Sequence, residues 1–159
     1  MSAPSDEVLA AWRSFLTAHA LITRRISQEL TAENLPDLAW YDVLWALYRQ
    51  PKRRLRINEL AREVVLSPTA MSRFVDRLEQ AGVVRREAVP SDRRAFHIVI
   101  TEEGIALLRR MWPTYAAGIG RYFAPCVEDN VTVARSVFER MAAAARSDGD
   151  ASAAMRDSK

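Results

Sequence analysis

Residues 57–82 restrict the fold more than any other part of the sequence. Ile57, Leu60, Ala61 and Val64 stand at positions i, i+3, i+4 and i+7, so they make one apolar stripe on a short helix. A second amphipathic pattern begins only a few residues later. Two short helices joined by a tight turn are the arrangement of a helix-turn-helix.

The second helix has start and stop signals at its two ends. The hydroxyl of Ser67 can cap it, Pro68 occupies the first helical position, and Gly82 stands where a left-handed residue would end it. One face is apolar, with Met71, Phe74, Val75 and Leu78. The opposite face is polar and basic, with Thr69, Ser72, Arg73, Asp76, Arg77 and Gln80. We therefore predict that this face points away from the core.

The residues that follow predict a β-hairpin. Residues 83–88 are β-branched at first and then charged, and residues 95–100 alternate with a period of two. The six residues between them supply turn chemistry, because Pro90 fixes φ and Asp92 can hydrogen-bond its own backbone. Two arginines, Arg93 and Arg94, complete this turn. A hairpin in this place is the wing of a winged helix-turn-helix.

These segments resemble the signature of the MarR family of bacterial regulators. The matching blocks, in the family's order and spacing, are residues 58–61, 66–73, 76–86, 90–95 and 99–104. The resemblance extends from about residue 35 to residue 108. It implies a mainly α fold with a small β-wing, in which the winged helix-turn-helix is flanked by N- and C-terminal dimerisation helices.

The rest of the chain fits that plan. A length of 159 residues suits a single domain. Ser5 can cap an amphipathic helix of about 25 residues, which is longer than a small domain needs, and Thr101 can cap another. We predict one domain over 1–159, with the DNA-binding lobe at 36–100, dimerisation helices at 5–32 and 101–146, and a disordered tail at 147–159.

Positive charge is concentrated in the predicted lobe. Residues 49–94 hold twelve Lys or Arg against six Asp or Glu, a net charge of +6. The whole chain has a net charge of +3, so the remainder carries −3. A solvated surface rich in arginine would give the same count. Together with the helix-turn-helix, however, this imbalance favours a polyanionic partner, double-stranded DNA.

The second helix is expected to enter the major groove. There Arg73 can bond guanine O6 and N7 with two hydrogen bonds, and Arg77 is expected on a phosphate. The resemblance implies that Arg94 enters the minor groove, that Asp92 holds it and that Arg93 contacts the backbone. The basic segment before residue 57 either contacts phosphates or is a solvated loop. The expected DNA contacts are Arg54, Arg56, Ser67, Pro68, Thr69, Ser72, Arg73, Arg77, Asp92, Arg93 and Arg94.

An effector pocket is a further hypothesis that comes from the resemblance, because family members often bind small aromatic anions. The candidate residues are Trp12, His19, Trp40, Tyr41, Asp42, Trp45 and Arg86. Aromatic residues at helical spacing also suit a core, and the sequence leaves both readings open. A subset that senses urate-like purines has acidic and basic residues at places comparable to Asp42, Arg73 and Arg86, but it also has a long N-terminal extension that this sequence lacks.

The function predicted from these features is a homodimeric, sequence-specific DNA-binding regulator. We expect a repressor that binds a palindromic operator and is released by a small aromatic ligand. The alternative is a protein-interaction or architectural module without an effector. The sequence shows no catalytic constellation, phosphate-binding glycine loop or metal-ligand cluster, so neither an enzyme nor a cofactor is expected. No signal peptide or membrane span is readable, which favours the cytoplasm, and no role is assigned to Cys126.

Overall fold

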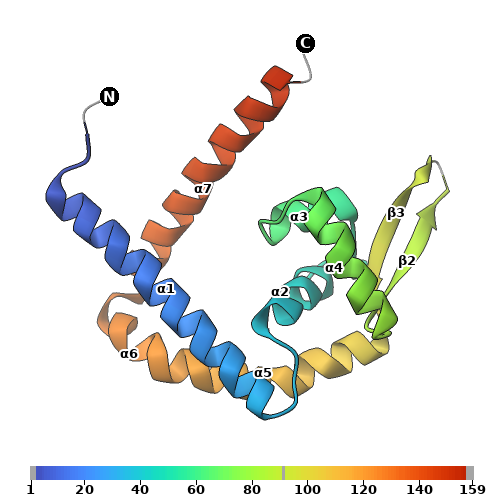
Figure 1. Ribbon diagram of the computed structural model, residues 1–159, viewed down its shortest axis with the longest axis horizontal. Helices are drawn as coiled ribbons and strands as arrows, with labels where there is room; N and C mark the ends of the chain where they lie inside the picture. The colour runs from blue at the N-terminus through green and yellow to red at the C-terminus, as the bar shows by residue number, and fades with distance from the viewer. Residues whose placement is uncertain (1–2, 91, 157–159) are drawn as a thin grey trace. The chain divides into compact units, whose positions relative to one another are not determined.

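Helices dominate the computed structural model, which describes residues 3–90 and 92–156 (Figure 1). The side chains of residues 93, 94 and 147–156 lie outside the description. A single three-stranded antiparallel sheet accompanies the helices in the described residues. The predicted class, mainly α with a small β-wing, is confirmed. None of the helices in the described residues is long and apolar enough to cross a membrane.

The elements follow the order expected of a winged helix-turn-helix between flanking helices. They are α1 (Asp6–Ala32), α2 (Leu38–Tyr48), β1 (Arg54–Arg56), α3 (Ile57–Glu63), α4 (Pro68–Gln80), β2 (Val84–Val89), β3 (Asp92–Ile100), α5 (Glu102–Tyr122), α6 (Ala124–Val127), the 3-10 helix η1 (Glu128–Asn130) and α7 (Val131–Arg156). The chain divides into two compact units, one up to Gly118 and one from Ile119, so that α5 takes part in both. The single domain remains a prediction.

The helix-turn-helix consists of α3 and α4, and the predicted signals act at its ends. The Ser67 hydroxyl accepts a hydrogen bond from the Ala70 N–H at 3.1 Å, and Pro68 is the first residue of α4. The predicted apolar face of α4 is buried throughout. Gly82 takes a φ of 74° after the helix, as a left-handed stop should. The turn between α3 and α4 contains Val65 at a φ of 58°, which the sequence did not predict.

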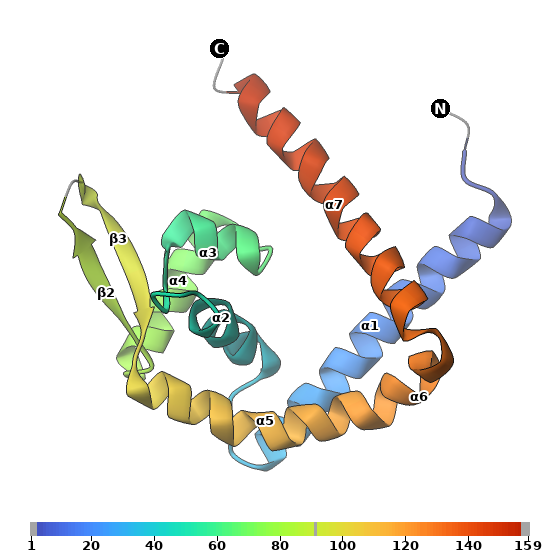
Figure 2. The same cartoon turned by 180° about the vertical axis from the view of Figure 1, so that it is seen from behind.

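The sheet has the strand order β1-β3-β2. Leu55 pairs with Ile98, and Ile98 pairs with Arg86, so these side chains share the face of the sheet that packs against α4. The hairpin turn is shorter than predicted, because Val89 pairs with Asp92 and β3 begins there. Asp92 and the two arginines after it therefore stand on the strand, not in the turn. Figure 2 shows β2 and β3 side by side in the wing.

Within the first unit, α1 and α5 cross closely. Ile26 is buried, and a Cβ added at Gly118 would lie 2.6 Å from Ile26 Cγ1, so glycine allows the two helices to approach. Near this crossing the Thr114 hydroxyl donates to a carboxylate oxygen of Glu33 at 2.6 Å. Helix α5 continues through Pro113.

The second unit contains the end of α5, α6, η1 and α7. The rings of Phe123 and Phe138 lie 6.3 Å apart. Helix α7 extends to Arg156, so the disordered tail predicted from residue 147 is wrong for 147–156. The alanines of this stretch have high intrinsic helix propensity, and they extend the helix past Gly149. Residues 157–159 of the predicted tail lie outside the described residues.

Candidate nucleic-acid interface

The outer face of α4 is built from exposed polar and basic side chains. Ser67, Pro68, Thr69, Arg73 and Arg77 are exposed, and Ser72 is half-buried, so the helix presents every residue predicted for the major groove. The buried face of the same helix contributes Met71, Phe74, Val75 and Leu78 to the core. Because the core residues fix the rotation of α4, the basic face is held outward.

Arg77 lies against an aromatic ring. Its guanidinium carbon lies 4.7 Å from the centre of the Phe74 ring, a cation–π contact. Phe74 also contacts Trp40 on α2, and the two rings meet edge to face at 6.4 Å. Trp40 was predicted to border an effector pocket; its ring contacts the recognition helix α4, and the pocket role remains a prediction.

The wing brings the predicted basic residues to one sheet. Arg54 on β1 forms an ion pair with Glu87 on β2 at 3.1 Å, and Arg85 pairs with the same carboxylate. The hydrogen bond from Arg85 has the largest effect on the pKa of Glu87; with the charge of Arg85 and the contact from Arg54 it outweighs burial and holds this pKa below its usual value. Arg56 and Asp92 are exposed. The side chains of Arg93 and Arg94 lie outside the description, so the Asp92–Arg94 pair and the minor-groove contact remain predictions.

Arg86 joins the wing to the recognition helix. Its guanidinium bonds Asp76 at 2.6 Å and also Glu79, both on α4. Burial opposes the charge of Arg86, but the hydrogen bonds and charges of the two carboxylates prevail and raise its pKa. Arg86 was predicted to lie near an effector, and the structure gives it this connecting role. The spacing of residues in the sequence did not predict the contacts of Arg86 with α4.

The remaining effector candidates fall into separate groups. The rings of Trp12 and His19 both lie beside the Phe15 ring on α1, at 5.8 Å and 6.4 Å and tilted against it. Tyr41 packs against Trp45 of its own helix and against Trp112 and Tyr115 of α5, with the Tyr115 ring 4.7 Å away. Trp112 and Tyr115 were not among the predicted site residues, although aromatic side chains three positions apart on one helix were a usable signal. A pocket formed by all seven candidates remains a prediction.

Asp42 lies at the edge of this aromatic group. Together with Trp45 it lines a cleft of about 340 Å³ that reaches Arg49, Glu63 and Val65. Asp42 has an exposed surface overall, but its carboxylate is partly buried. This burial, and then the negative charge of Asp37, raise the pKa of Asp42. Burial, and then the negative charge of Asp42, raise the pKa of Tyr115.

The fold and the basic face of α4 define a winged helix-turn-helix DNA-binding protein. Residues 34–95 match the sequence profile of the MarR family. The HTH-type transcriptional regulator MhqR of Bacillus subtilis (strain 168) is 31% identical over 101 residues, which are 64% of this chain and 68% of MhqR. The HTH-type transcriptional repressor MdtR of the same organism is 28% identical over 94 residues, 59% of this chain and 61% of MdtR.

Solved structures of similar proteins cover more of the chain. AbsC, a MarR family transcriptional regulator from Streptomyces coelicolor, superimposes with a TM-score of 0.81 at 28% identity, over 92% of this chain and 99% of AbsC. Sco3205, from the same organism and solved in complex with DNA, gives a TM-score of 0.79 at 29% identity, over 89% of this chain and 92% of Sco3205.

The chain belongs to the MarR family of winged helix-turn-helix transcriptional regulators. Like the relatives that it matches, it is a DNA-binding regulator of transcription and not an enzyme. The matched segment spans about two thirds of the length of those sequence relatives.

Proposed function

We propose that the protein is a homodimeric repressor that binds a palindromic operator. The observation that carries the proposal is the outward basic face of α4 beside a basic wing, in a fold similar to that of the DNA-bound Sco3205. In a two-fold dimer, the two copies of α4 would read half-sites about one DNA turn apart, roughly 34–36 Å. As a regulator of the bacterial type it would act in the cytoplasm.

The dimer is supported by apolar surface that one chain leaves exposed. On α1 the exposed apolar residues are Val8, Trp12, Phe15, Leu16 and Leu21. On α7 they are Val131, Val133, Val137, Phe138 and Met141. Exposed apolar faces of this extent mark contact surfaces in water-soluble proteins. A second copy of the same two helices would cover them symmetrically, as closed oligomers do.

The DNA contacts divide into base reading and backbone binding. Arg73 would bond a guanine in the major groove, and Arg77 and the N-terminus of α4 would bind phosphates. Arg94 would enter the minor groove with Asp92 holding it, and Arg93 would contact the backbone. Arg56, which is exposed at the junction of β1 and α3, would bind a further phosphate, together with Arg54.

Repression and effector release rest on separate support. Repression is supported by the relative MdtR, which is a transcriptional repressor. Release by a small aromatic ligand is supported by the aromatic group of Tyr41, Trp45, Trp112 and Tyr115, which is only partly buried. Trp45 and Trp112 are 47% and 51% exposed, so they retain surface on which a planar ligand would stack.

A selection from random duplexes with the purified protein, at two salt concentrations, tests the proposal. We expect an enriched palindrome with half-sites one helical turn apart, bound more weakly as the salt concentration rises. Arg73→Ala should relax the preference at one base position in each half-site, and Arg77→Ala should weaken binding to about the same extent on every sequence. Arg110→Ala, which removes an exposed arginine from α5, should change neither. Enrichment of no sequence, with only salt-sensitive background binding, would leave an architectural role.

A further inference from the structure

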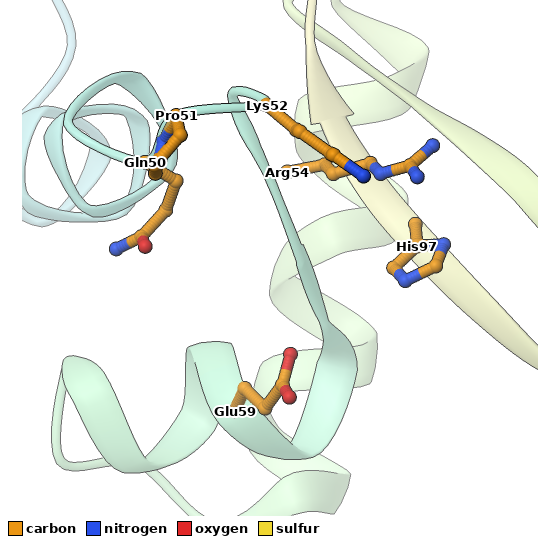
Figure 3. A pocket seen from close by; sticks show the side chains of 6 residues that line it. All are labelled: Gln50, Pro51, Lys52, Arg54, Glu59 and His97. Carbon is orange, nitrogen blue, oxygen red and sulfur yellow. The ribbon is translucent and has the colours of Figure 1, made fainter.

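A polar cleft opens on the face of the sheet opposite α4. It has a volume of about 350 Å³ and is lined by Gln50, Pro51, Lys52, Arg54, Glu59 and His97 (Figure 3). In the figure the side chains of Lys52 and Arg54 extend in one direction over the cleft, the His97 ring faces it from β3, and the Glu59 carboxylate points toward it from α3. Three basic side chains thus come from three separate segments.

The backbone fixes the place of these groups. Leu55 and Ile98 point to the α4 side of the sheet, so their neighbours Arg54 and His97 point to the other side. His97 is paired with Arg56 in the strand register, which adds a fourth basic residue to this face. Lys52 stands in the turn before β1, where Arg53 takes a φ of 50° and Arg53 N–H bonds the Gln50 carbonyl at 2.9 Å.

The acidic groups on this face already have partners. Glu87 is shared by Arg54 and Arg85, and Glu59 accepts a hydrogen bond from the backbone N–H of Arg56 at 2.7 Å. Within residues 3–90 and 92–156, neither Lys52 nor His97 forms an ion pair or a side-chain hydrogen bond. The lining therefore has two positively charged side chains, Lys52 and Arg54, against one carboxylate, Glu59. The donors of Lys52 and His97 are not engaged by the carboxylate of Glu59 or that of Glu87.

We infer that this cleft is an oxyanion site that takes a phosphate group, with Lys52 and His97 as its principal donors. A phosphate offers the acceptor oxygens and the charge that an ammonium and an imidazole bind. Two sources supply this chemistry: a backbone phosphate of the operator, outside the segment that α4 reads, or a free phosphate-bearing solute. The first source rests on the proposed function, and the second does not.

Inorganic phosphate tests the cleft without DNA. The chain has two histidines, His19 on α1 and His97 in the cleft, so the imidazole signals in a proton–carbon NMR spectrum separate the site from an internal reference. With pH and ionic strength held constant, phosphate should shift the His97 signals saturably and leave those of His19 unchanged. Lys52→Gln should weaken this binding at least tenfold, and the matched Arg110→Gln should not.

His97→Gln both assigns the signals and supplies a second variant. Phosphate binding to this variant, followed by phosphorus NMR line widths, should weaken as it does for Lys52→Gln. Circular dichroism checks that each variant is folded. The inference is overturned if the His97 signals do not respond, if both histidines respond alike, or if Arg110→Gln weakens the binding as much as Lys52→Gln does.

The selected operator then distinguishes the two sources. If a DNA phosphate occupies the cleft, Lys52→Gln should lower the slope of log affinity against log salt concentration by about one, and Arg110→Gln should leave it unchanged. Loss of inorganic phosphate binding with an unchanged slope identifies a free anion as the ligand. If the wild-type protein selects no operator but still binds phosphate at His97, the proposed function fails and the cleft site stands.

Discussion

Helices α4 and α1 are both amphipathic, but they expose opposite faces. Helix α4 buries its apolar residues and turns Thr69, Arg73 and Arg77 outward. Helix α1 buries only Ile26 and Leu30 near its C-terminal end, and leaves Trp12 50% exposed. The core of the chain thus covers the whole apolar face of α4, but only the C-terminal part of the apolar face of α1.

This difference separates two kinds of partner. An exposed face with hydroxyls and guanidinium groups suits a polyanion, whose contacts are mostly hydrogen bonds and charge. An exposed face of Trp, Phe and Leu suits another protein surface, because burying it removes apolar area from water. Single substitutions can disturb the support of α4, either of the two exposed faces, or positions that lie outside both.

The largest effect is expected where the lobe meets α5. A Cβ at Gly104 would lie 2.2 Å from the Val83 carbonyl oxygen, which is backbone and cannot move alone. Gly104→Ala should therefore lower the free energy of unfolding by about 3 kcal/mol. Urea denaturation of both proteins at the same protein concentration measures this change in the free energy of unfolding. The control is Gly120→Ala, where no atom lies within 4 Å; it should be neutral or stabilising by up to about 1 kcal/mol.

The exposed face of α1 is tested by Trp12→Glu. A charge in the middle of the proposed dimer interface should weaken dimerisation by about 2 kcal/mol, or roughly 30-fold, while the monomer stays folded. Sedimentation equilibrium measures the dissociation constant. Arg13→Ala, at the neighbouring exposed position, is the matched control. A wild-type protein that remains monomeric at high concentration would contradict the dimer itself.

The exposed face of α4 is tested by Arg73→Ala. Removal of a bidentate guanine contact should cost about 1–3 kcal/mol at one base position in each half-site and leave the other positions unchanged. Binding to a set of single-base operator variants measures this loss of preference. A uniform loss over all sequences would recast Arg73 as a phosphate contact, and the face would then bind backbone only.

Val65 tests the turn between α3 and α4 without touching either face. It is 82% exposed and has a φ of 58°, a conformation that strains a β-branched residue. Asn34 adopts the same φ elsewhere in the chain, so Val65→Asn should raise the free energy of unfolding by about 1 kcal/mol. Thermal denaturation measures the change. The exposed neighbour provides the control, since Leu66→Asn should give no such gain.

The smallest effect is expected at Glu87, on the sheet face opposite α4. Its pKa is lowered in the folded protein, so its pairing stabilises the fold above the pKa of the unfolded carboxyl, about 4.3, and is lost as the pH falls below that value. Glu87→Gln should therefore reduce stability slightly at pH 7 and have less effect at pH 3. Denaturation at the two pH values measures the difference; equal effects would contradict it.

Local signals in the sequence predicted most of the lobe. Ser67, Pro68 and Gly82 mark the ends of α4 by chemistry that depends only on adjacent residues, and Thr101 caps α5 as expected, accepting from the Gly104 N–H at 3.1 Å. The strained φ of Val65 was not predictable, because the packing of two helices imposes it against the preference of the residue itself.

Contacts between distant segments were harder to predict. Arg86 lies ten residues after Asp76, and only the fold shows that β2 returns alongside α4. Likewise Tyr41 on α2 contacts Tyr115 on α5, although the two residues are far apart in the sequence. The wing turn was predicted too long because Asp92 and the arginines after it have the composition of a turn, whereas pairing of Val89 with Asp92 already begins the strand.

The connection through Arg86 has a consequence for the choice of operator. Arg86 pairs with Asp76 and Glu79 and so ties β2 to α4. If α4 reads the major groove and the wing reads the minor groove, as proposed, these ion pairs hold the two readers of one subunit at a set separation. The number of base pairs between the segment that α4 reads and the segment that the wing reads is then fixed by the chain itself and by the ion pairs of Arg86. An added base pair inside a half-site would be rejected even when every contacted base is correct.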